Sequence, residues 1–149
     1  MTDQTRRRFL SSLALAGAGT LAACATPAPR QTAKPAAPVV AANARTTARG
    51  TFEGRSNHVT TGHARVVASE GTFVIELEED FFFDGAPDPK VALGRGGYDP
   101  NAVLAPLGAN TGRQTYALKA GLDIGNYDQV WIWCERFNVP LGVADLTLV

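Results

Sequence analysis

Three side chains in the C-terminal hundred residues could bind a soft metal or carry redox chemistry: Cys134, His58 and His63. Thiolate and imidazole are the ligand types that copper and zinc prefer, and one histidine or cysteine could serve as an axial ligand of haem. Cys134 could also act without a cofactor, as a redox thiol. No Cys-x-x-Cys-His motif occurs, so covalently attached c-type haem is excluded. The identity of a cofactor is left undecided by the sequence, with haem and copper as the two candidates.

The two histidines do not follow a regular ligand pattern. In the stretch HVTTGH they lie five residues apart around Gly62, a separation that suits neither one face of a helix nor one face of a strand. A copper or zinc site made of His58, His63 and Cys134 would therefore have to assemble across strands. The alternative is structural: His58 caps a turn and His63 lies on a surface strand.

Cys134 belongs to the stretch VWIWCERFNV, residues 130–139. Strand alternation places Val130, Ile132 and Cys134 on one face and the two tryptophans on or near the other. Because both faces are apolar, we predict a central strand. Cysteine is among the most buried residue types, so an inert core thiol is one interpretation. A functional thiol or ligand is the second, and an intermolecular disulfide is the third.

The N-terminus has the features of an export signal. A basic segment that contains Arg6 and Arg7 precedes a weakly apolar run over residues 9–23, and the arginine pair with the following Phe-Leu resembles the twin-arginine export signal. The run is shorter than the roughly 20 residues that span a membrane. Leu-Ala-Ala-Cys at 21–24 resembles the bacterial lipobox, which predicts that Cys24 carries lipid after cleavage. The alternative is an ordinary signal-peptidase site beside a chance cysteine.

A lipidated Cys24 could not form a disulfide, and its lipid would determine where the protein is located. Only two cysteines exist, so Cys134 would have no partner for a disulfide within the chain. The expected location is the bacterial cell envelope, with the protein anchored by lipid to a membrane and facing the periplasm or the exterior. The sequence does not distinguish the inner from the outer membrane.

Composition divides the chain into a signal peptide (1–23), a lipidated cysteine with a flexible linker rich in Ala and Pro (24–49), and a folded domain (50–149). The linker after the cysteine has no acidic or aromatic residue and cannot bury a core. The domain has seven basic and thirteen acidic residues. This mildly acidic balance argues against nucleic acid as a partner, because phosphate binding needs a basic face.

The domain is predicted to be all-β. Alternating residues at 62–69 and 71–81 flank a polar turn and predict a hairpin. Loops rich in Gly, Pro, Asn and Asp, including GRGGYDPN at 94–101, separate the remaining expected strands, which lie at 50–54, 89–94, 113–119, 129–137 and 141–149. About seven short strands at this spacing predict an antiparallel β-sandwich or barrel.

Other motifs of catalysis are missing from the sequence. No Ser, His and Asp set stands in a context such as Gly-x-Ser-x-Gly, so a classical enzyme is not expected. Six acids crowd one end of the hairpin, and their spacing fits no EF-hand loop. We interpret them as a solvated acidic loop: Glu76, Glu78, Glu79, Asp80, Asp84 and Asp88.

Four segments together resemble the DM13 domain in order and spacing: GTFEGRSNHVTTGHARVV, FFFDGAPDPKVALG, TGRQTYAL and YDQVWIWCERFNVPLGVADL. The last is the most specific, with its tyrosine and acid, an apolar strand that ends in Trp-Cys, a basic residue, Phe, and a Gly and Ala two residues apart. The resemblance covers nearly all of residues 50–148. Pro89 departs from the family pattern, which more often has an apolar residue there.

The resemblance implies an all-β extracytoplasmic module, found alone in bacterial envelope proteins or beside DOMON-type domains in animals. Electron transfer has been proposed for the family because of the cysteine that matches Cys134. His58 matches a position that is often histidine, whereas His63 does not match such a position. Two hypotheses follow: an electron carrier that uses Cys134 with an envelope redox partner, or a non-catalytic binding or structural module in which Cys134 is an inert core residue.

Overall fold

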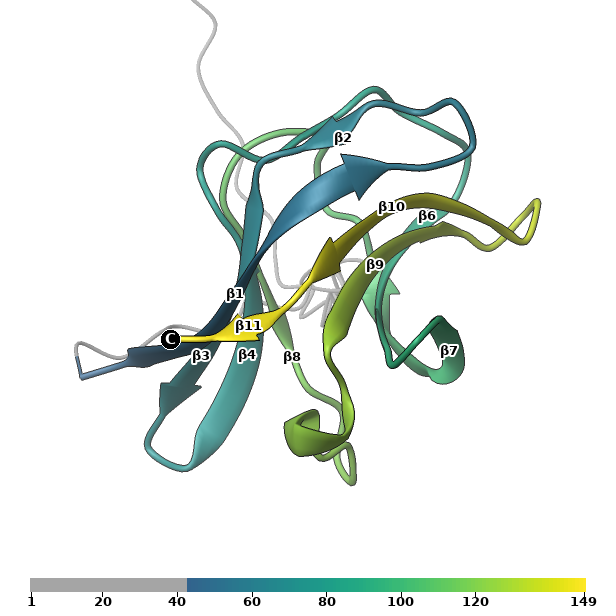
Figure 1. Cartoon of the computed structure of the whole chain (residues 1–149). Helices are drawn as coiled ribbons and strands as arrows, with labels where there is room; N and C mark the ends of the chain where they lie inside the picture. The colour runs from purple at the N-terminus through teal and green to yellow at the C-terminus, as the bar shows by residue number, and fades with distance from the viewer. Residues whose placement is uncertain (1–42) are drawn as a thin grey trace, which may run out of the picture. The chain divides into compact units, whose positions relative to one another are not determined.

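A computed structural model describes residues 43–149 of the chain (Figure 1). The export signal at Arg6 and Arg7, the lipidation site at Cys24 and most of the predicted linker lie outside these residues. Within 43–149 no helix has the length and apolar character that crossing a membrane would require.

The regular secondary structure of the described chain is almost entirely β-strand, which confirms the predicted fold class. Its one helical element is a short 3-10 turn, η1 (Ile124–Asn126). The strands are β1 (Arg45–Gly54), β2 (Thr60–Thr61), β3 (His63–Ser69), β4 (Thr72–Leu77), β5 (Phe82–Phe83), β6 (Pro89–Gly94), β7 (Tyr98–Pro106), β8 (Gln114–Ala117), β9 (Gln129–Cys134), β10 (Val139–Asp145) and β11 (Thr147–Leu148).

One antiparallel sheet coils into a nearly closed barrel (Figure 1). Its strands follow the order β7-β6-β9-β10-β1-β3-β4-β8, and β11 adds to β1; β2 and β5 form a separate small ribbon. Side chains from the sheet, from the β2–β5 ribbon and from the segments between strands meet in one core. The largest fully buried ones are Phe81, Phe83, Ile75, Leu77, Leu93, Ile132 and Leu141.

Strand β9 is central, as predicted, because β6 pairs with one of its edges and β10 with the other. Val130, Ile132 and Cys134 are each at most 1% exposed, whereas Trp131 and Trp133 are partly exposed on the opposite face. The alternation that the sequence predicted is therefore confirmed. It places the thiol inside the barrel and the indole rings outside.

Two predictions of secondary structure are wrong. The strand expected at 50–54 begins five residues earlier, at Arg45, because the backbone of residues 45–49 pairs with β3 and β11 and Ala48 is buried. Composition alone does not reveal such pairing. β7 occupies part of the segment that we expected to be a loop. It lies at the edge of the sheet, where its prolines cost no hydrogen bond to a neighbouring strand.

The predicted hairpin is confirmed, and its two-residue turn is a place to gain stability. Glu70 and Gly71 both have positive φ, at 50° and 79°, as in the type I′ turns that favour Asn-Gly. We expect Glu70→Asn to raise the free energy of unfolding by about 0.5 kcal/mol, because asparagine tolerates this backbone region better than glutamate. Urea unfolding checks it. An equal gain from Glu70→Ala would contradict this explanation and point to removal of the charge.

Candidate functional site

Cys134 is the last residue of β9 and lies in the barrel core. Its side chain is 1% exposed, and its thiol donates a hydrogen bond to the carbonyl of Pro87 at 3.0 Å. Its Cα lies opposite Pro89 on β6 and Val139 on β10. Among residues 43–149 it is the one cysteine, and it is free. The structure thus presents a buried thiol beneath the loop that connects β5 to β6.

Charged side chains tie this loop to the end of β9. Lys90 Nζ lies 2.6 Å from Asp88 Oδ1 and 3.2 Å from Glu135 Oε2. The backbone N–H of Glu135 also donates to the Asp88 carbonyl at 3.2 Å. The hydrogen bond to Asp88 is the main cause that raises the pKa of Lys90; desolvation opposes it, and Glu135 adds to it. These contacts hold the loop closed over the thiol.

Aromatic rings cover the outer face of the same strand. Trp133 stacks on Tyr98 of β7 with ring centroids 4.0 Å apart and an interplanar angle of 1°. Trp131 meets Trp133 edge-on at 6.1 Å, and its Nε1–H donates to Gln129 Oε1 at 3.3 Å. Burial, followed by the charges of Glu135 and Asp99, raises the pKa of Tyr98.

The stack on Tyr98 could not be found from the sequence. Tyr98 belongs to the segment that we interpreted as a flexible loop, and it meets Trp133 only because β7 joins the edge of β6. Tyr98 also lines a shallow surface hollow, together with Arg95, Asp99 and Tyr127. The stack of Trp133 on Tyr98 therefore ends at this hollow, while Cys134 occupies the other face of β9.

His58 is held by a carboxylate at the end of a turn. Its backbone N–H donates to the Arg55 carbonyl at 2.9 Å, and its ring Nδ1 lies 2.9 Å from Asp84 Oδ1. The second oxygen of Asp84 accepts from the backbone N–H of Val59 at 3.0 Å. This backbone bond, followed by the hydrogen bond with His58, lowers the pKa of Asp84. These contacts suit the structural alternative for His58, in which it caps a turn.

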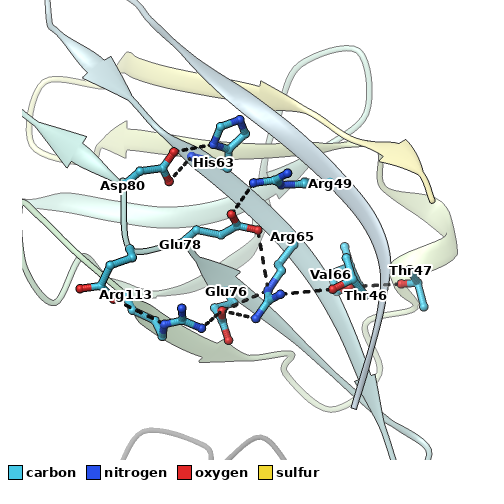
Figure 2. A network of polar contacts seen from close by, with 11 residues as sticks. Thr46, Thr47, Arg49, His63, Arg65, Val66, Glu76, Glu78, Asp80 and Arg113 are labelled. Carbon is cyan, nitrogen blue, oxygen red and sulfur yellow. Dashed lines mark hydrogen bonds and ion pairs between the residues drawn. The ribbon is translucent and has the colours of Figure 1, made fainter. Parts of the chain in front are cut away.

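His63 stands at the start of β3 and makes a similar pair (Figure 2). Its Nδ1 lies 2.5 Å from Asp80 Oδ2, and its backbone N–H donates to Asp80 Oδ1 at 3.1 Å. Glu78 lies beside the pair, so that the ligand atoms of His63, Glu78 and Asp80 all lie within 4.8 Å of one another.

The structure does not bring together the three ligands considered for a copper or zinc site. Within residues 43–149, the one group of three potential ligands is His63 with Glu78 and Asp80, and it includes neither His58 nor Cys134. A copper site with two histidines and a thiolate therefore does not fit this arrangement. Of the three predicted residues, only His63 lies in a cluster of ligand atoms.

The acids at the hairpin end are not all solvated, which corrects our interpretation of them. Glu76 is only 3% exposed, and its Oε1 accepts from Arg65 Nε at 3.1 Å, from Arg65 Nη2 at 2.6 Å and from Arg113 Nη1 at 2.9 Å (Figure 2). Glu78 pairs with Arg49 Nη2 at 2.6 Å. A cross-strand network of ion pairs thus covers β3 and β4. Only the alternation of Glu76 and Glu78, at the end of β4 and just after it, could have hinted at it.

These observations define a class: an all-β barrel-like domain with one buried thiol and stacked aromatic rings on the same strand. A family model described as "Electron transfer DM13" matches residues 51–146, which is more than half of the chain. The chain belongs to the DM13 family, as its closing segment indicated. Comparison with curated proteins and with solved structures found no match.

Proposed function

We propose that this protein is a lipid-anchored electron-transfer protein of the bacterial cell envelope, in which Cys134 is the redox centre, either as a thiol or as a cofactor ligand. The family description supports a redox role. Arg6, Arg7 and Cys24 support export and anchoring, since they match the twin-arginine and lipobox patterns. The expected partners are the membrane, reached through the lipid, and a redox protein of the envelope.

The observation that carries the proposal is the pairing of a thiol and a ring stack across one strand. Cys134 points into the core, and its neighbour Trp133 lies on the outer face against Tyr98 at 4.0 Å. Burial keeps water and large reagents away from the sulfur. The stacked rings offer a partner protein a contact surface, and one of them, Trp133, is the residue next to Cys134 in the sequence. β9 therefore connects a protected centre to an accessible aromatic contact.

The residues present limit which cofactor could use Cys134. The copper site with two histidines and Cys134 does not assemble, so these residues do not fit a copper centre. An axial haem ligand needs only one side chain, but a thiolate at Cys134 would have to give up its hydrogen bond to Pro87 and displace the loop above it. His58 would have to exchange its bond with Asp84. A thiol without a cofactor requires neither change.

The test is the ultraviolet and visible spectrum of the full-length protein, exported by its own signal, before and after reduction with dithionite. A Soret band or a thiolate-to-metal band that changes on reduction and is lost in both Cys134→Ser and Cys134→Ala is the expected result for a ligand role. For a bare thiol, the spectrum is featureless, and a small peroxide must oxidise the Cys134 thiol of the wild type to a sulfenic acid, with an alcohol or water as the other product, while an added thiol reductant must restore it. His58→Asn is the control for the second candidate ligand.

A featureless spectrum together with a thiol that no oxidant reaches would contradict the redox role. It would favour the second candidate, a non-catalytic binding or structural module, which the 1% exposure and the hydrogen bond of Cys134 also support. Cys134→Ser would then change only stability. Burying a hydroxyl in an apolar site costs about 1 to 3 kcal/mol; we expect the lower end, because serine can also donate to Pro87.

A further inference from the structure

We propose that His63, Glu78 and Asp80 form a binding site for a divalent transition-metal ion of the zinc type. Their ligand atoms lie within 4.8 Å of one another. One imidazole nitrogen with two carboxylate oxygens is a donor set that zinc accepts, and water can complete the tetrahedron. Calcium and magnesium prefer more ligands, all of them oxygens. The proposal does not depend on Cys134 or on electron transfer.

Backbone contacts bring the three side chains together without the ion. Glu78 follows β4 directly opposite His63, and its backbone N–H donates to the His63 carbonyl at 2.9 Å. Asp80 is fixed by the bond from the His63 backbone N–H at 3.1 Å. Gly62 allows this approach, since a Cβ there would lie 2.5 Å from the Asp80 carbonyl oxygen. The ligands thus come from two adjoining segments that the fold already holds in place.

The charge and exposure of the cluster suit a dication. The side chains of His63 and Asp80 are 33% and 51% exposed, so an ion can enter and keep water ligands. A bound dication would replace the hydrogen bond between His63 Nδ1 and Asp80 Oδ2, and the charges of Glu78 and Asp80 would balance it.

Two arginines compete with a metal ion for Glu78, and Arg49 is the nearer, since Arg65 Nε lies 3.8 Å from Glu78 Oε1. The Nη2 of Arg49 lies 2.6 Å from Glu78 Oε2, where it supplies the positive charge that a metal ion would otherwise provide (Figure 2). The Arg49 side chain is 47% exposed and ends in solvent, so that it can leave Glu78 without opening the core. Removing its charge should therefore strengthen metal binding, an effect that a loss of folding cannot imitate.

The test is isothermal titration calorimetry of the full-length protein with zinc chloride after treatment with a chelator, and with magnesium chloride as a second titrant. We expect one zinc ion per chain and no magnesium binding. His63→Asn and Glu78→Gln should each weaken zinc binding at least tenfold, whereas Arg49→Gln should strengthen it several-fold. His58→Asn is the matched control, because it breaks a similar histidine–carboxylate pair, with Asp84, that has no third ligand.

Spectra of ring nitrogens in ¹⁵N-histidine-labelled protein identify the ligand. Zinc should shift the His63 ring and leave His58 unchanged. The proposal is overturned if neither the wild type nor Arg49→Gln binds zinc at millimolar concentration. It is also overturned if the binding survives His63→Asn, or if Cys134→Ser or His58→Asn abolishes it in a protein that circular dichroism shows to be folded.

Discussion

Gly62→Ala is expected to lower the free energy of unfolding by about 3 kcal/mol or more, because two costs add at this position. Gly62 has φ +92°, in a region that L-residues with a Cβ avoid. A Cβ would also lie 2.5 Å from the Asp80 carbonyl oxygen and 2.6 Å from the Cα of Phe81. Neither backbone atom can move far, because the Phe81 side chain is buried in the core.

Gly71→Ala is the matched control for this change. Gly71 has a similar φ, +79°, but no atom lies within 4 Å of where its Cβ would be. This substitution should cost only the backbone term, about 1 kcal/mol. Thermal or urea unfolding followed by circular dichroism measures both variants. Equal losses would show that the close approach of Gly62 to residues 80 and 81 is not energetically important.

Glu76→Gln should have the second large effect, a loss of about 2 to 3 kcal/mol. Glu76 is buried at 3% exposure, and one of its oxygens accepts bonds from both Arg65 and Arg113. Glutamine keeps the shape but removes the charge, so two guanidinium groups face each other across a neutral amide. We place the loss below the usual range for a buried pair because the arginine side chains are 29% and 53% exposed.

Glu79→Gln provides the comparison within the same network. Glu79 lies 3.6 Å from Arg113, but its side chain is 79% exposed. Exposed ion pairs contribute about 0 to 1 kcal/mol, so this variant should unfold almost like the wild type. High salt should reduce the difference between Glu79→Gln and the wild type more than that between Glu76→Gln and the wild type. A similar loss in both variants would mean that burial does not strengthen the contacts of Glu76.

The sequence predicted the features of the fold that depend on local alternation. The spacing of Val130, Ile132 and Cys134 predicted the inner face of β9. The apolar residues on both faces of this strand predicted its central place in the sheet. The polar turn between β3 and β4 gave their hairpin. These patterns suffice because each strand must bury one face whatever its neighbours are.

The features that the sequence did not predict depend on contacts between residues far apart in the chain. Arg113 reaches Glu76 across 37 residues of sequence, so an acid that looks solvated in its own segment is buried. The stack of Tyr98 on Trp133 depends on an edge strand whose prolines and asparagine indicated a loop. Likewise, His63 lies beside the carboxylates of Glu78 and Asp80, and not beside His58 and Cys134. The register of strand pairing, and not the spacing along the sequence, sets which side chains meet.

The pairing of β1 has a mechanical consequence. This strand enters the barrel at Arg45 with hydrogen-bonding neighbours on both of its edges: β3 along one edge, and β11 followed by β10 along the other (Figure 1). Tension that arrives from the N-terminal side along the strand axis would load these bonds in parallel, in shear, and not open them one by one. A domain pulled by its leading end should therefore keep its shape under force.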